Sequence, residues 1–161
     1  MLRIRRMEET DIGEAADVHA SAFPRQTCSL KWITCCLRAL PKTQSFVADL
    51  DGRIVGLALW TERSGFRRDA VIELEQIAVH PDHQGRGIGT ALIVESLPSV
   101  ESSIIERGAR IKHILVNTRT DNAAQRLYAK LLGAEVEAVI PSLFSGDEVY
   151  MIARDFKGVR S

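Results

Sequence analysis

The sequence predicts an α/β protein (α+β order), with one mixed sheet of about seven strands and helices on both faces. Short alternating or apolar runs indicate strands, and stretches with apolar residues three and four apart indicate helices. Their order along the chain is strand, two helices, three strands, helix, strand, helix, two strands. With 161 residues, 45% of them hydrophobic and 26% charged, the chain fits one globular domain over residues 1–161.

The first third contains one strand and two helices. Leu2–Arg6 alternates and predicts the first strand. Thr10 is a suitable N-cap for a helix that ends at Phe23 and Pro24. The second helix is expected over about Cys28–Leu40, because Pro41 cannot continue it.

A three-stranded meander follows. Asp51-Gly52 is a strong hairpin signal between the runs Gln44–Leu50 and Arg53–Thr61. After a loop that contains Arg63, Arg67 and Arg68, Val71–Val79 is the third strand.

The second half alternates helices and strands. A helix that begins near Gly87 meets Pro98, which we expect to kink or break it before a second piece, Val100–Glu106. A strand, a helix with Gly133 as its C-cap and two final strands follow, over Ile111–Asn117, Asn122–Leu132, Ala134–Ile140 and Glu148–Ala153.

The charge balance argues against a surface built for bulk anionic partners. The 21 basic residues equal the 21 acidic ones, so we expect no nucleic-acid or membrane partner. The N-terminal residues do not resemble a secretory signal, and no run approaches membrane-spanning length. Cys28, Cys35 and Cys36 lack zinc-ligand spacing, so we expect no metal and a cytoplasmic setting.

The most informative stretch is Glu73–Leu92, which predicts a strand, a glycine turn and a helix. Glycines leave backbone N–H groups uncovered, and a helix start attracts anions, so the turn predicts a phosphate site. The nucleoside-triphosphate loop requires a lysine that Gly89-Thr90 lacks. The dinucleotide fingerprint requires a third glycine that is missing here.

A third motif fits the turn. Gln84-Gly85-Arg86-Gly87-Ile88-Gly89 matches the Gln/Arg-x-x-Gly-x-Gly signature of the GNAT acetyltransferase superfamily. The resemblance to that family covers nearly the whole chain and is specific over residues 71–133. The resemblance implies the GNAT fold: a mostly antiparallel sheet whose central parallel strands are splayed apart. It also implies acetyl-CoA as cosubstrate.

The resemblance assigns residues to the cosubstrate. Backbone groups of the glycine turn are expected to hold its pyrophosphate, and the preceding strand is expected to pair with its pantetheine arm. The expected cofactor-binding residues are Ile77, Ala78, Val79, Gln84, Gly85, Arg86, Gly87, Gly89, Thr90, Asn117 and Asn122. Asp121 stands where the family usually has asparagine, which weakens the expected side-chain contact to pantetheine.

Transfer to an amine requires a base, and often an acid for the leaving thiolate. Glu73 and Glu75 are two apart on a strand, hence on one face, and either can be the base. The alternative for each is an ordinary solvated strand position or a salt bridge. By resemblance, Tyr128 is the acid; the alternative for this tyrosine is a core position.

The acceptor pocket is expected along Phe23–Cys28 with Trp32, Trp60 and Phe144. The aromatic groups there can hold the acceptor or belong to the core; we favour the core for Trp32 and leave both alternatives open for Trp60. The arginines Arg63, Arg67 and Arg68 could select an anionic acceptor. The sequence thus predicts direct acetyl transfer to a primary amine of a small molecule, and a homodimer is possible. The alternatives are a protein or peptide N-acetyltransferase and a non-catalytic CoA-binding module.

Overall fold

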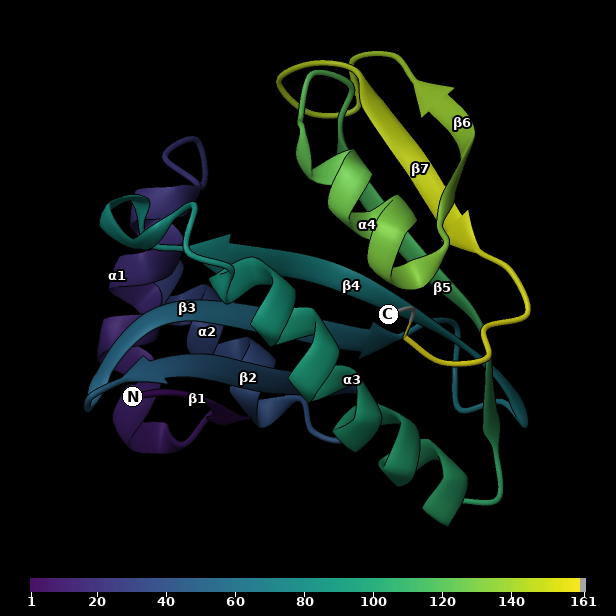
Figure 1. The fold of residues 1–161 in the computed structure, drawn as a ribbon, viewed down its shortest axis with the longest axis horizontal. Helices are drawn as coiled ribbons and strands as arrows, with labels where there is room; N and C mark the ends of the chain where they lie inside the picture. Colours follow the sequence, from purple (N-terminus) through teal and green to yellow (C-terminus); the bar gives the residue numbers. More distant parts are fainter. Residues whose placement is uncertain (160–161) are drawn as a thin grey trace. The chain divides into compact units, whose positions relative to one another are not determined.

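The seven predicted strands form one sheet in the computed structural model, which describes residues 1–159. The sheet order is β1-β2-β3-β4-β5-β7-β6 (Figure 1). The bounds are Leu2–Arg6 for β1, Thr43–Leu50 for β2, Arg53–Glu62 for β3, Asp69–Val79 for β4, Arg110–Arg119 for β5, Glu135–Ile140 for β6 and Glu148–Ala153 for β7. The predicted fold class and strand positions are confirmed.

The helices also lie where the sequence places them. They are α1 at Ile12–Ala22, α2 at Ser29–Arg38, α3 at Ile88–Glu106 and α4 at Ala124–Leu132, with 3-10 turns η1 at Glu9–Asp11 and η2 at Pro81–His83. The expected N-cap was wrong: Thr10 lies inside η1, and the Asp11 carboxylate accepts the Glu8 N–H at 2.8 Å instead.

Pro98 does not end its helix, so of the expected kink or break the break is wrong, and the kink stays a prediction. Helix α3 runs through it as one element of 19 residues. Pro98 cannot donate to the carbonyl of Val94, but both residues are exposed, so water can satisfy that carbonyl. A proline on the solvent side of a helix therefore costs less than one facing the core.

Helix α3, with 19 residues, is longer than any helix that we expected from the sequence. By length and composition it could cross a membrane, contrary to our prediction that no segment approaches that size. This is weak evidence of a span, because the core helix of a soluble protein has the same composition. Leu92, Ile93 and Leu97 are indeed almost fully buried.

The chain forms two compact units. The first contains Met1–Thr61 and Gln76–Val100, and the second contains Glu62–Glu75 with the described residues from Glu101 on. In the first unit, β1 and β2 pair antiparallel, as do β2 and β3. Helices α1 and α2 cover one face of these strands and α3 covers the other (Figure 1).

The alternation of side chains along β3 explains the two covered faces. Leu57 and Leu59 belong to the apolar cluster beneath α1 and α2. On the other face, the buried Trp60 donates its indole N–H to Ser96 of α3 at 2.8 Å. A Cβ at Gly56 would lie 3.0 Å from the Ala78 carbonyl oxygen, so a side chain there would push against the backbone of β4, and glycine permits the close approach.

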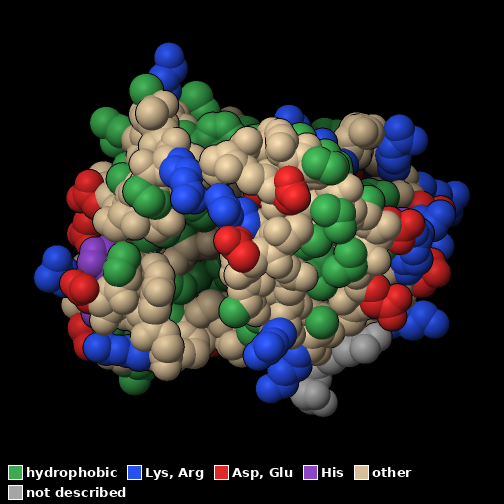
Figure 2. Space-filling model, turned by 90° about the horizontal axis from the view of Figure 1, so that it is seen from above, with side chains coloured by type: hydrophobic (Ala, Val, Ile, Leu, Met, Phe, Trp, Pro, Cys, Tyr) green, Lys and Arg blue, Asp and Glu red, His purple; other side chains and the backbone are tan. Residues whose placement is uncertain are grey.

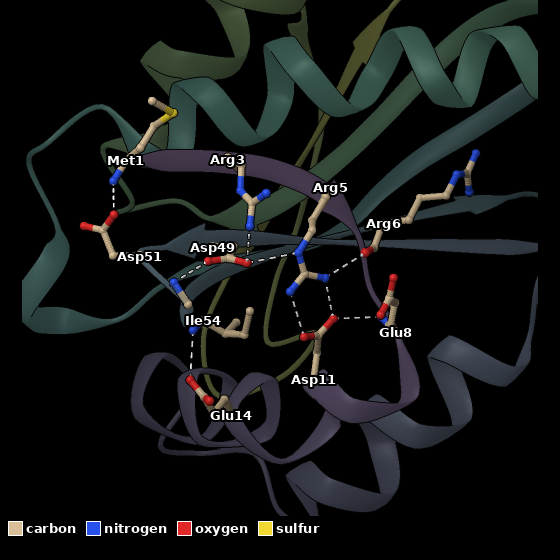
Figure 3. Close-up of polar contacts among 11 residues, drawn as sticks. Met1, Arg3, Arg5, Arg6, Glu8, Asp11, Glu14, Asp49, Asp51 and Ile54 are labelled. Atoms are coloured by element: carbon tan, nitrogen blue, oxygen red, sulfur yellow. Dashed lines mark hydrogen bonds and ion pairs between the residues drawn. The ribbon is translucent and has the colours of Figure 1, made fainter.

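An ion cluster fastens the N-terminal strand to its neighbours in this unit (Figure 3). Arg5 donates two hydrogen bonds to Asp11, at 2.7 and 2.9 Å, and a third to Asp49 at 3.1 Å. Asp49 also accepts the Gly52 N–H of the β2–β3 hairpin at 2.8 Å. Charge-assisted and bidentate contacts of this kind are the stronger hydrogen bonds in proteins.

The second unit contains the C-terminal strands and α4. Strand β7 pairs antiparallel with both β5 and β6, and α4 packs against β5 (Figure 1). Strands β4 and β5 are parallel, and their ladder runs from Asp69↔Arg110 to Glu73↔Leu115. Because β5 continues to Arg119, the ladder covers only the first part of the strand, in agreement with the predicted splay.

Charges of both signs are interspersed on the face that Figure 2 shows. No single sign dominates there, as expected from equal numbers of acidic and basic residues.

Candidate active site

The glycine turn has the backbone conformation that its sequence requires. After β4 and η2, Gly85 and Gly87 have φ angles of +73° and +78°, which side-chain-bearing residues rarely adopt. A Cβ built at either glycine would meet nothing within 4 Å. Helix α3 then begins at Ile88, so its first N–H groups follow the turn directly. The turn therefore offers uncovered backbone donors beside open space.

Local hydrogen bonds hold the turn in place. Gln84 donates its side-chain amide to the carbonyl of Val79 at 3.1 Å, and Asp82 donates its N–H to His80 at 3.2 Å. Arg86 and Thr90 are exposed. The residues Ile77–Val79 at the end of β4 and the predicted phosphate-binding residues thus belong to one connected segment of the first unit.

The two candidate bases differ in their surroundings within the second unit. Glu73 is buried, with 6% of its surface exposed, whereas Glu75 is half-buried. Nε of Arg63 lies 3.3 Å from Oε2 of Glu73. Burial raises the pKa of Glu73, the Arg63 guanidinium opposes that effect, and the Glu75 carboxylate adds to it. Glu73 is therefore a carboxylate that binds a proton more tightly than usual.

Tyr128 lies on the buried face of α4, as the helical spacing predicted. Burial raises its pKa to about 12, so the hydroxyl holds its proton at neutral pH. Over residues 1–159, the Tyr128 hydroxyl makes no hydrogen bond. The hydroxyl oxygen is not completely enclosed by the protein. The ring is thus core, while the hydroxyl is available to a ligand.

The two candidate asparagines near α4 make contacts within the protein. Asn117 donates to Glu148 at 3.1 Å. Asn122 donates to Thr118 at 2.8 Å and accepts the Ala124 N–H at 2.8 Å, which caps the start of α4. A cofactor contact of either asparagine stays a prediction. To contact the cofactor, Asn122 would either add that contact to its cap of α4 or give up the cap.

The structure adds a polar network that sequence reasoning missed. Gln76 of β4 accepts the Trp32 indole N–H at 2.7 Å and contacts the ring of His19 at 3.0 Å. It also donates to Gln26 at 2.9 Å, while the other ring nitrogen of His19 lies 2.8 Å from Ser29. Gln76 follows Glu75 directly, but an isolated glutamine in a strand carries no signal that would have identified it.

This network changes the interpretation of the two tryptophans. Trp32 was expected in the core, but 38% of its surface is exposed, and the indole instead bonds Gln76. Trp60 is the core tryptophan, with 1% exposure. The amphipathic spacing of α2 did not reveal that Trp32 lies at the edge of its apolar face.

Two of the three arginines of the β3–β4 loop contact other residues through their side chains. Arg63 pairs with Glu73, and Arg67 donates to the carbonyl of Ser64 at 3.0 Å.

Among the described residues, no group of three or more His, Cys, Asp and Glu side chains could hold a metal ion.

Comparison with known proteins identifies the family. The family model for the acetyltransferase (GNAT) domain matches residues 41–131, from the end of α2 to α4. The chain belongs to the GNAT acetyltransferase family. Residues 41–131 include the glycine turn, both candidate bases and Tyr128.

Individual relatives agree with this assignment. An uncharacterized N-acetyltransferase of Methanocaldococcus jannaschii is 33% identical over 99 residues, which are 59% of this chain and 40% of the relative. The chain thus spans less than half the length of that relative. The solved ribosomal-protein-S18-alanine N-acetyltransferase of Escherichia coli has a TM-score of 0.74 and 20% identity, over 98% of this chain and 96% of that one.

A third similar protein contains coenzyme A, the thiol part of the expected cosubstrate. It is an aminoglycoside 6'-N-acetyltransferase solved with coenzyme A, with a TM-score of 0.74 and 14% identity, over 96% of this chain and 98% of that one. At this identity the likeness shows the fold alone.

Proposed function

We propose that this chain transfers an acetyl group from acetyl-CoA to a primary amine by direct transfer. Membership of the GNAT family supports the reaction class. The observation that carries the proposal is Glu73, a buried carboxylate whose pKa is raised and which, among residues 1–159, forms one ion pair, with Arg63. Such a group is suited to general-base catalysis near neutral pH.

The residues of the glycine turn fit a phosphorylated cosubstrate. The open space beside Gly85 and Gly87 would be filled by a side chain at either position, and the N–H groups at the start of α3 attract anions. We assign the pyrophosphate to Gln84–Thr90 and the pantetheine arm to Ile77–Val79. Asn117 and Asn122 are further candidate contacts.

Acetyl-CoA, when bound, supplies an acyl carbon whose bond to sulfur breaks as the bond to the acceptor nitrogen forms. Glu73 takes the proton that the acceptor ammonium must lose before its nitrogen can attack. Glu75 is the alternative base, because it shares the strand face of Glu73.

Tyr128 is the proposed donor to the departing thiolate. Its raised pKa keeps the hydroxyl protonated over the working pH range. An ordinary thiol has a pKa of about 8.5, so full transfer from this tyrosine would be uphill. We therefore expect Tyr128 to act chiefly by donating a hydrogen bond to the sulfur.

The acceptor class has two candidates. We favour a small-molecule amine, and the aminoglycoside 6'-N-acetyltransferase with the same fold is a precedent. The second candidate is the N-terminus or a lysine of a protein, for which the ribosomal-protein-S18-alanine enzyme is the precedent.

The test is an acceptor screen that follows free thiol. The protein is incubated with acetyl-CoA and panels of small amines, aminoglycosides and peptides. We expect acceptor-dependent thiol release with at least one panel, and a lower turnover in Tyr128→Phe at similar acetyl-CoA affinity. Tight binding of acetyl-CoA without release from any panel would instead support a non-catalytic CoA-binding module.

A further inference from the structure

The loop between β3 and β4, residues 63–68, reaches the candidate base. Arg63 follows the last residue of β3 and donates its N–H to the carbonyl of Val71 at 2.8 Å. That bond fixes its backbone against β4, two residues from Glu73. The guanidinium is half exposed, but the Glu73 side chain that it approaches has only 8% exposure.

A second arginine fastens the same loop. Arg107, which follows α3, forms an ion pair with Glu62, whose carboxylate is 5% exposed. Its guanidinium also lies over the ring of Phe66, 4.7 Å from the centroid. Within the loop, Ser64 and Gly65 have φ angles of +58° and +93°, which produce its turn. The loop is therefore a fixed structure, and its shape determines where Arg63 points.

Among the groups that act on Glu73, Arg63 favours the ionised form of its carboxylate. Burial favours the neutral acid, and so does the negative charge of Glu75 on the same strand face. Arg63 is the positive group that opposes both effects. It contacts Oε2 and, across residues 1–159, no hydrogen bond or ion pair occupies Oε1, which is left to receive a proton.

We propose that Arg63 is a positioning residue that keeps the Glu73 carboxylate ionised and orients it to receive the acceptor's proton. The inference rests on the proposed function, with Glu73 as the base. The proton passes from the acceptor ammonium to Glu73, and no other group changes its charge in that step. Arg63 itself is not expected to touch the acceptor or acetyl-CoA.

The closing experiment compares Arg63→Gln with two matched variants. Arg63→Lys keeps the positive charge. Arg67→Gln removes the same charge from the same loop, at a side chain that donates to the Ser64 carbonyl and does not contact Glu73 within the described residues. The dependence of kcat/KM on pH is measured for each variant. The Glu73 carboxyl is titrated separately by carbon-13 NMR, with its signal assigned from Glu73→Gln.

For Arg63→Gln we expect the Glu73 titration to move to higher pH. Its kcat/KM should fall about three- to tenfold at the acid end of the profile and approach the wild-type value on the alkaline side. The Glu73 titration and the pH profile of kcat/KM in Arg63→Lys should lie close to those of wild type. In Arg67→Gln neither of them should shift.

Two results would overturn the inference. One is an unmoved Glu73 titration in Arg63→Gln, and the other is an equal shift in Arg67→Gln, which would indicate only a general charge effect. Failure of the proposed function is a separate outcome: wild type would then release no thiol, while the NMR titration would still decide whether Arg63 controls Glu73.

Discussion

Asp49 in the first unit and Glu73 in the second are both buried carboxylates beside an arginine, with side-chain exposures of 5% and 8%. Their pKa values nevertheless move in opposite directions. The Gly52 N–H and Arg5 hold the pKa of Asp49 below its ordinary value, whereas burial raises the pKa of Glu73 in spite of Arg63. Burial beside an arginine therefore does not by itself set the charge of a carboxylate.

The difference lies in the number of hydrogen-bond donors. Asp49 accepts the Gly52 N–H and the Arg5 Nε–H, and Asp11 in the same cluster accepts three hydrogen bonds. Glu73 has one ion-pair contact at 3.3 Å and, over the described chain, no hydrogen bond. Donors stabilise the charged form directly. We interpret the first arrangement as one that stabilises the fold, and the second as one that leaves a carboxylate available for chemistry.

The largest expected effect is on activity. Glu73→Gln should lower kcat by about 10²-fold or more, because an amide cannot accept the acceptor's proton. Steady-state kinetics with an acceptor from the screen would measure it. Glu75→Gln is the matched control, and we expect a smaller loss. If the two losses were reversed, Glu75 would be the base, and the contrast between Glu73 and Asp49 would have no catalytic meaning.

The next effect is on stability. Arg5→Gln should lower the free energy of unfolding by about 2 kcal/mol, because the variant leaves Asp11 and Asp49 without their main cationic partner. This loss is below the range for fully buried ion pairs because the Arg5 side chain is partly exposed. Urea unfolding would show this as a lower midpoint at an unchanged slope. Arg3→Gln is the control, because Arg3 is mostly exposed and lies 3.5 Å from Asp49. Equal losses in the two variants would show that charge alone, and not the hydrogen-bonded geometry, stabilises this cluster.

The elements could be predicted from sequence because their signals are local. The Asp51-Gly52 hairpin, the glycine turn and the α4 spacing each depend on neighbouring residues. The partners of Glu73 and Gln76 could not be predicted, because they come from the β3–β4 loop and from α1 and α2. The uninterrupted α3 was missed for a related reason: whether Pro98 breaks a helix depends on which side faces solvent.

The smallest expected effect separates the two carboxylates by the sign of their pH dependence. Asp49 binds protons more weakly in the folded state than in the unfolded state. Its contribution to the free energy of unfolding is therefore present above pH 3.8, its ordinary pKa, and is lost as the pH falls. Asp49→Asn should therefore cost about 1.5 kcal/mol near neutral pH, and progressively less in acid. Glu73 binds its proton more tightly when folded, so wild type loses stability as pH rises above the ordinary value of 4.5.

Glu73→Gln should accordingly be neutral in acid and slightly more stable than wild type at neutral pH. Urea unfolding of both variants between about pH 3.5 and pH 7.5 measures the two slopes against wild type. Slopes of the same sign would mean that Glu73 is a structural carboxylate like Asp49, and that its single ion pair outweighs its burial. Opposite slopes combined with a large loss of kcat in Glu73→Gln would show that the position gives up stability for activity, as expected of a catalytic group.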